Sequence, residues 1–256
     1  MTDDRGPVAA TPIWVDLATN DPGASRAFYR ALFGWEGEPV ADPAAGGYAV
    51  MQLERRDVAG IGPSQDPEQP AAWNVYIGSE NAETIADRVR MAGGTVIAPP
   101  FDVFDQGRMA VFQDPSGAFF SIWQPMMMRG AQVMRQPNSV GWCELNSRDI
   151  DAARRFYREV FGWDERETLL DDGTGSYVEF QVDGRSVCGG MAMASSVPAE
   201  VPSHWMVYFL ADDIDASCSR ARDLGGRVVM EPNPYPGGRF AVLSDPQGAT
   251  FGLMSA

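Results

Sequence analysis

The octapeptide FYRALFGW at residues 28–35 occurs again as FYREVFGW at residues 156–163, with six of eight positions identical. The similarity extends outward from these copies. Residues 13–36 align with 141–164 without a gap, and GRMAVFQDPSGAFF at 107–120 aligns with GRFAVLSDPQGATF at 238–251. An internal repeat of this length indicates a duplicated domain. We therefore predict a first domain over residues 1–125, a linker over 126–138 and a second domain over 139–256.

The octapeptide reads as the end of a helix. Asp21 followed by Pro22 is typical of a helix start, and apolar residues then recur at helical spacing. Gly34 is placed to end the helix in the left-handed conformation. The sequence predicts a helix over 22–33 that turns Phe28 toward a sheet, with Trp35 covering the turn and no assignable chemistry for Tyr29.

Each half also contains two weakly similar units of strand, helix and strands. In the first half we predict strands at 13–18, 48–53, 58–61, 73–77, 95–98, 109–113 and 119–123, and a second helix at 82–92. Asp114 and Asp245 stand in DPSG and DPQG, where Asp, Pro and Gly favour a hairpin turn. Turn chemistry explains these two carboxylates better than catalysis does.

The composition excludes several classes of function. The net charge is −15, which disfavours nucleic-acid binding, and all 20 basic residues are arginine, so lysine chemistry is absent. His204 is the single histidine, so a His-rich metal site is impossible. The three cysteines are widely spaced and are expected to be free or buried thiols. Arg154, Arg155 and Arg158 are expected to form a charge-paired, solvated helix face.

The sequence contains no apolar run of the roughly 20 residues that a membrane-spanning helix requires. The opening residues lack the basic start and apolar block of a signal peptide. We therefore expect a cytoplasmic protein, without a membrane or nucleic-acid partner, that is a monomer or a homodimer.

Taken in order and seen twice, these motifs resemble the vicinal oxygen chelate superfamily, which includes glyoxalase I, bleomycin-resistance proteins and extradiol dioxygenases. The motifs are FYxxxFGW closing the first helix, GG after the second helix, and the final DPxGxxF hairpin. Within that superfamily the chain is similar to tandem glyoxalase-like proteins of actinobacteria described as "hydroxylase". The resemblance implies an α+β fold of two fused glyoxalase-like domains. Each would have two βαβββ units forming an open barrel around a cavity.

The resemblance also implies where a metal enzyme of this superfamily would keep its ligands, counted from the motifs. None of these positions holds a convergent set of good donors, so we predict no metal site and no cofactor. The positions are Trp14, Trp73 or Asn74, Ser121 and residues 60–62 in the first half, and Trp142, Trp205 or Met206, Gly252 and residues 189–191 in the second. His204 lies one step from such a position without a suitable partner.

Side chains alternate along a strand, so Asp16 shares a face with Trp14, and Glu144 shares one with Trp142. Aromatic walls with few polar groups are typical of small-molecule pockets, although the same aromatics could simply fill each barrel. Asp16 and Glu144 are the candidate acid or base groups, or else structural carboxylates. The remaining candidate ligand-binding residues are Asn74, Tyr76, Phe104, Arg108, Ser121, Trp123, His204, Met206, Tyr208, Tyr235 and Arg239.

Arg108 and Arg239 are expected to pair with Asp16 and Glu144, or to bind an anionic group of a substrate. Phe104 and Tyr235 lie in loops that could close on a ligand. Tyr48 and Tyr177 match each other, and strand packing accounts for them adequately.

Four functions remain open. The first is metal-independent binding of an aromatic or hydrophobic small molecule. The second is a metal-free isomerase, lyase or hydroxylase-type enzyme of natural-product metabolism that uses Asp16 or Glu144. The third is an interaction or regulatory protein with vestigial cavities. The fourth is a metal-dependent lactoylglutathione lyase-like enzyme.

Overall fold

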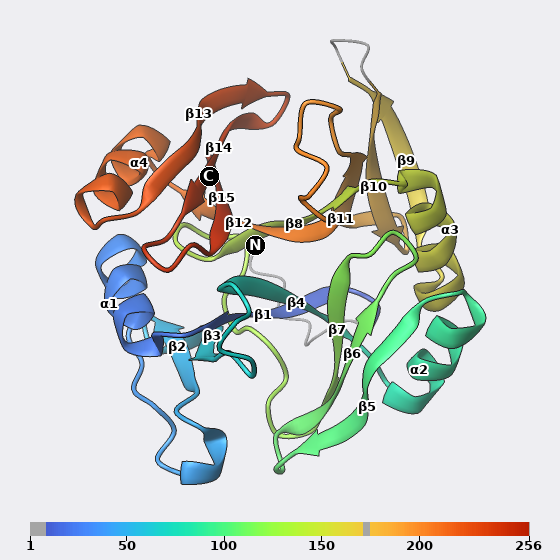
Figure 1. The fold of residues 1–256 in the computed structure, drawn as a ribbon, viewed down its shortest axis with the longest axis horizontal. Helices are drawn as coiled ribbons and strands as arrows, with labels where there is room; N and C mark the ends of the chain where they lie inside the picture. The colour runs from blue at the N-terminus through green and yellow to red at the C-terminus, as the bar shows by residue number, and fades with distance from the viewer. Residues whose placement is uncertain (1–8, 171–174, 256) are drawn as a thin grey trace. The chain divides into compact units, whose positions relative to one another are not determined.

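The computed structural model describes residues 9–170 and 175–255. Residues 1–8, on which part of the localisation argument depends, lie outside the described residues. Four α-helices and fifteen strands appear in the described part of the chain, in the order β-α-β-β-β repeated with small variations (Figure 1). The helices are α1 (Pro22–Phe33), α2 (Ala82–Met91), α3 (Ile150–Phe161) and α4 (Ile214–Asp223), and a short 3-10 helix lies at Pro43–Ala45.

The strands of each half form one mixed sheet, and neither sheet closes into a barrel within the described residues. The first has the order β2-β3-β1-β4-β7-β6-β5 and the second β13-β14-β15-β12-β8-β11-β10-β9. The first-half strands are β1 (Pro12–Thr19), β2 (Ala49–Leu53), β3 (Arg56–Pro63), β4 (Ala72–Gly78), β5 (Thr95–Val103), β6 (Gly107–Gln113) and β7 (Phe119–Pro125). The second-half strands are β8 (Val140–Ser147), β9 (Asp164–Leu169), β10 (Ser176–Val182), β11 (Arg185–Ala192), β12 (His204–Ala211), β13 (Arg227–Tyr235), β14 (Gly238–Ser244) and β15 (Thr250–Ser255).

These bounds confirm the predicted α+β fold of two glyoxalase-like repeats and every predicted first-half element, with strand ends shifted by a few residues. β5 is the largest extension, because it continues through Pro99 and Pro100 to Val103 as an edge strand. An edge strand tolerates proline because one side of its backbone has no neighbouring strand to bond. In the described residues, no helix has the length and apolarity needed to cross a membrane.

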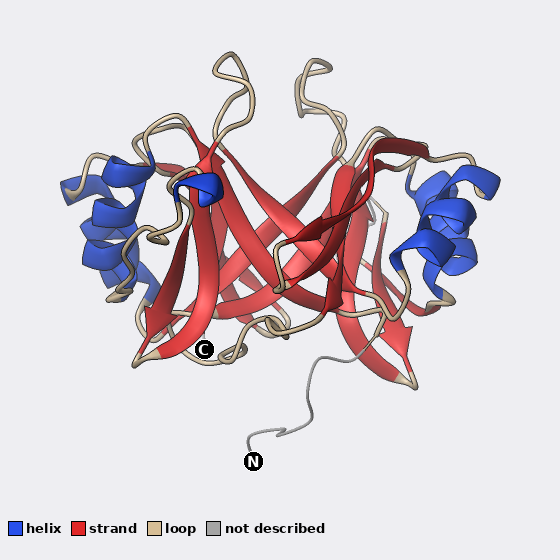
Figure 2. Cartoon of the chain, turned by 90° about the horizontal axis from the view of Figure 1, so that it is seen from below, coloured by secondary structure: helices blue, strands red, loops and turns tan. Residues whose placement is uncertain are grey.

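The chain divides into two compact units that do not follow the sequence repeats. One unit contains residues 1–14, 75–130 and 143–205, and the other contains 15–74, 131–142 and 206–256. Each unit therefore combines one βαβββ segment from each repeat. Within the first unit α2 lies beside α3, and within the second α1 lies beside α4, and one face of each helix pair lies against strands (Figure 2).

Local chemistry sets the helix ends as predicted. The carboxylate of Asp21 accepts a hydrogen bond from the Ala24 amide at 2.9 Å, and Asp149 accepts one from Ala152 at 2.9 Å. Gly34 ends α1 at φ 74°, a left-handed conformation that a residue with a Cβ atom adopts only with strain. Both termini of α1 are thus specified by the sequence itself.

The octapeptide forms the core of a unit, which the sequence did not reveal. The Trp35 side chain is fully buried and stacks on Tyr29, with ring centroids 5.6 Å apart. Its indole Nε1–H donates to the Asn138 carbonyl at 2.7 Å. Trp163 repeats the arrangement in the other unit, stacking on Tyr157 and donating to the Ala10 carbonyl at 2.7 Å.

Tyr29 also forms buried hydrogen bonds that sequence reasoning missed. Its hydroxyl donates to Asp245 Oδ2 at 3.3 Å and accepts a hydrogen bond from Trp73 Nε1 at 3.0 Å. In the other unit the Tyr157 hydroxyl donates to Asp114 at 3.1 Å and accepts one from Trp205 at 2.9 Å. In each unit, therefore, the tyrosine of one repeat bonds to the DPxG aspartate of the other.

The two aspartates confirm the predicted turns. Oδ1 of Asp114 accepts hydrogen bonds from the Ser116 and Ala118 amides at 2.8 and 3.0 Å. Burial raises the pKa of both Asp114 and Asp245, while these hydrogen bonds act in the opposite direction. Sequence reasoning did not reveal that each turn aspartate also binds a buried tyrosine.

Candidate functional site

A buried carboxylate on β1 is the centre of the candidate site. Asp16 is 8% exposed and accepts two hydrogen bonds from side chains of its own unit. Nδ2 of Asn74, on β4, donates to Oδ1 at 2.9 Å. The hydroxyl of Tyr48, just before β2, donates to Oδ2 at 3.3 Å. Three strand segments thus fix the orientation of one carboxylate.

Glycines on β3 make room for Tyr48. Gly60 pairs with Asp16 across the parallel strands β1 and β3. A Cβ atom at Gly60 would overlap the Tyr48 hydroxyl, and one at Gly62 would lie 2.6 Å from Tyr48 Cδ2. The phenol ring therefore runs along β3 from Gly62 to Gly60. Tyr48 as a residue is half-buried.

The corresponding carboxylate of the second half has different neighbours. Glu144 on β8 is 9% exposed and pairs with Gly189 of β11, as Asp16 pairs with Gly60. Nδ2 of Asn146 lies 3.5 Å from Oε1 of Glu144, a longer contact than that between Asn74 and Asp16. Met206 stands where the first half has Asn74, so an amide donor is replaced by a thioether.

Aromatic side chains gather on β4 and β7 of the first unit. Tyr76 pairs with Ser121 across these parallel strands, and both are nearly inaccessible. Trp123 is also buried, its Nε1–H donates to the Met128 carbonyl at 2.8 Å, and its ring packs where a side chain at Gly107 would lie. Trp14, at the start of β1, is 3% exposed.

The second unit contains three more of the aromatic candidates, Tyr208, Tyr235 and Trp142. The Tyr208 ring packs over Gly252, and its centroid lies 6.4 Å from that of Phe240. Tyr235 is the last residue of β13 and not part of a loop as predicted, and it contacts the same Phe240 edge-to-face at 6.2 Å. Trp142 is half-buried, with the Arg135 guanidinium 5.9 Å from its ring centroid. In both units, therefore, a buried aromatic ring among the candidate residues packs against a glycine.

The two predicted arginines pair elsewhere, so the expected pairing with Asp16 and Glu144 is wrong. Arg108 binds Glu83 at 2.5 Å and Asp102 at 2.7 Å, and Arg239 binds Asp215 at 2.6 Å. Glu83 lies on α2, Asp102 on the edge strand β5 and Asp215 on α4. These elements neighbour β6 or β14, where the two arginines lie, whereas Asp16 and Glu144 lie on the interior strands β1 and β8. Phe104 lies in its loop with its side chain 53% exposed.

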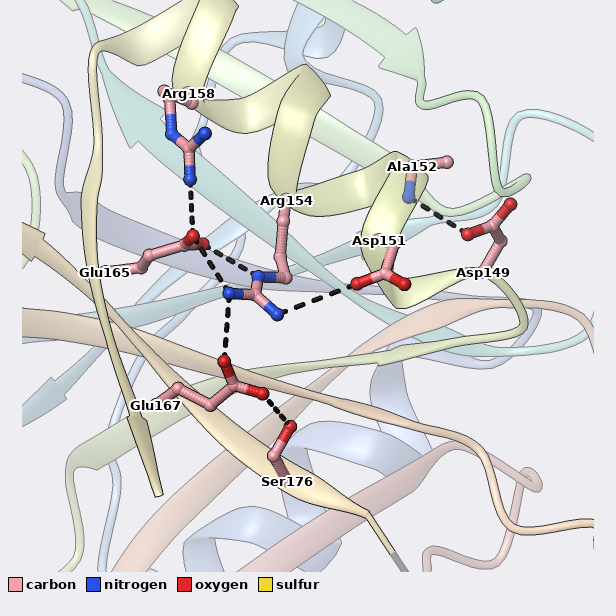
Figure 3. A network of polar contacts seen from close by, with 8 residues as sticks. All are labelled: Asp149, Asp151, Ala152, Arg154, Arg158, Glu165, Glu167 and Ser176. Atoms are coloured by element: carbon pink, nitrogen blue, oxygen red, sulfur yellow. Dashed lines mark hydrogen bonds and ion pairs between the residues drawn. The ribbon is translucent and has the colours of Figure 1, made fainter. Parts of the chain in front are cut away.

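Two members of the basic cluster on α3, Arg154 and Arg158, are charge-paired as predicted, although their main partners lie on β9. Figure 3 shows Arg154 between Glu165, Glu167 and Asp151, at 2.9, 3.2 and 3.6 Å. Arg158 also binds Glu165. The guanidinium of Arg154 lowers the pKa of Glu165, which stabilises the ionised network. This surface is accounted for by structure and contains no candidate site residue.

A family model for the "Glyoxalase/Bleomycin resistance protein/Dioxygenase superfamily" matches residues 11–122 and again 139–253. The chain belongs to this superfamily. The two matches correspond to the two repeats. The first strand of each repeat carries a carboxylate at the equivalent position, Asp16 in one and Glu144 in the other.

Within the superfamily, two relatives are similar over nearly their whole length. The "Anthracycline biosynthesis protein DnrV" of Streptomyces peucetius is 40% identical, covering 95% of this chain and 92% of that protein. The "Putative glyoxylase CFP32" of Mycobacterium tuberculosis is 39% identical, covering 95% of this chain and 94% of that protein.

Solved structures of the superfamily share the fold at low identity. A Mn(II)-bound glyoxalase from Novosphingobium aromaticivorans superposes with a TM-score of 0.68 at 16% identity, covering 96% of this chain and 82% of that chain. The 2,3-dioxygenase LapB from Pseudomonas sp. KL28 gives 0.67 at 15% identity, covering 98% and 94%.

The donor set of this superfamily member does not fit a metal. Across residues 9–170 and 175–255, no group of three or more His, Cys, Asp or Glu side chains is placed to hold an ion. His204 is half-buried, and its Nδ1 lies 2.9 Å from the Pro202 carbonyl. Cys143, Cys188 and Cys218 are buried free thiols, as predicted.

Tyr48 is the site residue that sequence reasoning missed. Its match to Tyr177 was attributed to strand packing, because tyrosine is common in strands. The available signal was the pair Gly60 and Gly62 in VAGIG, since glycine at alternate strand positions marks a close approach by another group.

Proposed function

We propose that the chain binds a planar aromatic small molecule bearing hydroxyl groups at the Asp16 site, without a metal held by the protein. The observation that carries the proposal is the Asp16 carboxylate, oriented by Asn74 and the half-buried Tyr48. Each carboxylate oxygen can accept more than one hydrogen bond, so a ligand hydroxyl can add to those present.

The chemistry of the site favours this class of ligand. A flat ring can stack on the Tyr48 phenol, which is worth about 0.5–1.5 kcal/mol beyond the area buried. A hydroxyl on that ring can donate to Asp16, whereas a carboxylate or phosphate would be repelled by it. The relative described as an anthracycline biosynthesis protein supports the assignment, because anthracyclines are hydroxylated polycyclic aromatics.

The test is a binding titration after exhaustive dialysis against EDTA. We expect 1,8-dihydroxyanthraquinone to quench tryptophan fluorescence and to bind with micromolar affinity by calorimetry. Asp16→Asn should weaken binding by about 10-fold or more, the range for losing a hydrogen bond to a charged group. The matched variant Glu144→Gln should change it less than about twofold. Affinity no tighter than millimolar for every hydroxylated aromatic tried would refute the proposal.

A second candidate is catalysis at the same place. Because the orientation of Asp16 is fixed by two donors, it could also take a proton from a bound hydroxyl or from carbon, as a metal-free isomerase, lyase or hydroxylase-type enzyme requires. This candidate predicts that Asp16→Asn abolishes turnover of a bound ligand. A variant that converts the ligand at the wild-type rate would exclude it.

A further inference from the structure

A pocket of about 330 Å³ lies in the first unit, between the start of β1 and the ends of β4 and β7, and no residue of the Asp16 site lines it. Small-molecule sites typically have volumes of about 300–1,000 Å³, so this one has room for a small ligand. Its lining includes Ile13, Gly78, Ser79, Glu80, Gln124 and Pro125.

The glycine at the end of β4 contributes no side chain to this pocket. Leu210 stands at the position equivalent to Gly78 in the second repeat. In that repeat the leucine lies so close to Gly141 that a Cβ atom on this glycine would be 2.7 Å from Leu210 Cγ. The same strand position therefore accepts a leucine in one repeat and leaves space in the other.

The side chain of Gln124 presents hydrogen-bond donors. Its Oε1 accepts the Ala82 N–H at 2.8 Å, at the start of α2. Because a backbone N–H bonds to the oxygen of a side-chain amide and not to its NH2 group, this contact fixes which way the amide is turned. Nε2 has no acceptor in the described part of the chain, so its two N–H groups are available to a ligand.

Ser79 and Glu80 add a further donor and an acceptor. Ser79 is 5% exposed, and its hydroxyl oxygen accepts the Asn81 N–H at 3.1 Å, which leaves the hydroxyl hydrogen for a ligand. Glu80 is exposed and forms no ion pair with another described residue. The pocket thus offers amide and hydroxyl donors beside a carboxylate that accepts.

This combination discriminates between classes of ligand. A phosphate or carboxylate has only acceptors, and Glu80 would repel it. An ammonium group has only donors and would leave Gln124 and Ser79 without acceptors. A hydroxyl group both donates and accepts, so several hydroxyls on one small ring can satisfy all three side chains. Ile13 and Pro125 supply apolar surface for the carbon atoms of such a ring.

We infer that this pocket binds one sugar ring, a neutral monosaccharide unit. Gln124 and Ser79 donate to its oxygen atoms, and Glu80 accepts from one of its hydroxyls. The inference goes beyond the proposed function, because it concerns a different site and a different class of ligand.

The test is a titration of the full chain with the methyl glycosides of glucose, galactose, mannose and rhamnose, followed by saturation-transfer NMR. At least one should bind with a Kd of about 1 mM or tighter. Gln124→Glu keeps an oxygen for the Ala82 N–H but removes the two donors, and should weaken binding about 10-fold. Glu80→Gln should weaken it about 3- to 10-fold, and Gly78→Leu, which fills the pocket, about 10-fold or more.

Asp212→Asn is the matched control, because Asp212 stands where Glu80 does in the other repeat, and it should change the affinity less than about twofold. If Gly78→Leu lowers the midpoint of thermal unfolding, the other two pocket variants decide, since both are nearly isosteric. Absence of binding by every glycoside overturns the inference, as does binding that Gln124→Glu and Glu80→Gln leave unchanged.

Two further arms separate this inference from the alternatives. Binding of propylammonium or inorganic phosphate, but of no glycoside, overturns it because the class of ligand is then wrong. The affinity for 1,8-dihydroxyanthraquinone should be unchanged in Gln124→Glu, and a loss as large as that for the glycoside overturns the claim of a separate site. Failure of the anthraquinone to bind wild type refutes the proposed function alone.

Discussion

The hydroxyl of Tyr29 donates to Asp245 Oδ2 at 3.3 Å across the two sequence repeats, and the same hydroxyl accepts a hydrogen bond from Trp73. Tyr29 is fully buried. One phenol thus satisfies a buried indole N–H and a buried carboxylate at once, and it belongs to the octapeptide that identifies the fold.

Replacement of Tyr29 by Phe should destabilise the protein strongly. The change keeps the ring but leaves the Trp73 N–H and the Asp245 oxygen without this partner. Each buried unsatisfied group costs about 1–3 kcal/mol, so we expect a loss of roughly 2–4 kcal/mol in the free energy of unfolding, measured by urea denaturation. Tyr48→Phe is the control, with a loss below about 1 kcal/mol because Tyr48 is half-buried. Similar losses in both variants would contradict this account.

The buried turn aspartates should give stability a specific pH dependence. Burial raises the pKa of Asp245 above its value in the unfolded chain. The native state then holds the proton more tightly, so this group's contribution is fully present below about pH 4 and is lost as pH rises through the raised pKa.

The stability of wild type minus that of Asp245→Asn should therefore fall as pH rises above about 4, measured by urea denaturation at a series of pH values. Asp114→Asn should behave alike, since burial raises its pKa as well. A difference that rises with pH for Asp245 would show that its hydrogen bonds outweigh burial.

The network of Arg154 should contribute modestly and depend on salt. Its partner Glu165 is only 18% exposed and is shared with Arg158. We expect Arg154→Ala to lower the free energy of unfolding by about 1 kcal/mol, and by less in 1 M salt. Arg90→Ala breaks an exposed pair with Asp87 and should change stability by no more than about 0.5 kcal/mol. Equal effects of the two substitutions would argue against a network.

Chelation should leave both folding and ligand binding unchanged. The described residues contain no group of three or more metal-ligating side chains, so EDTA has no protein-held ion to remove there. A ligand or metal that binds only the native state raises the unfolding temperature, and its removal lowers it. We expect the same unfolding midpoint and the same affinity before and after dialysis. A midpoint that falls with EDTA and recovers on adding Mn²⁺ would revive the metal-dependent alternative.

The fold was predictable because its signals are local. Asp21, Pro22 and Gly34 specify a helix through backbone chemistry that depends on a few neighbouring residues. Because the sequence is repeated, an element predicted in the first half could be predicted at the matching residues of the second half. Of the predicted site, the Asp16–Asn74 contact follows from two strands whose positions the family resemblance implied.

The rest depended on partners distant in sequence. Arg108 pairs with Glu83 and Asp102 because those carboxylates lie on the adjacent helix and strand, which strand periodicity does not reveal. The burial of Trp35 depends on Phe209, whose ring centroid lies 5.4 Å away, from the other repeat. The ring of Tyr48 depends on the absence of side chains at Gly60 and Gly62. The alternating glycines mark a close approach by some group, but they do not say which residue approaches.

The composition of the two compact units has a consequence for the duplicated gene. Each unit takes one βαβββ segment from each repeat, so deletion of either repeat removes half of both units. After duplication, the second copy is therefore retained by the requirements of folding, whether or not its own carboxylate meets a ligand.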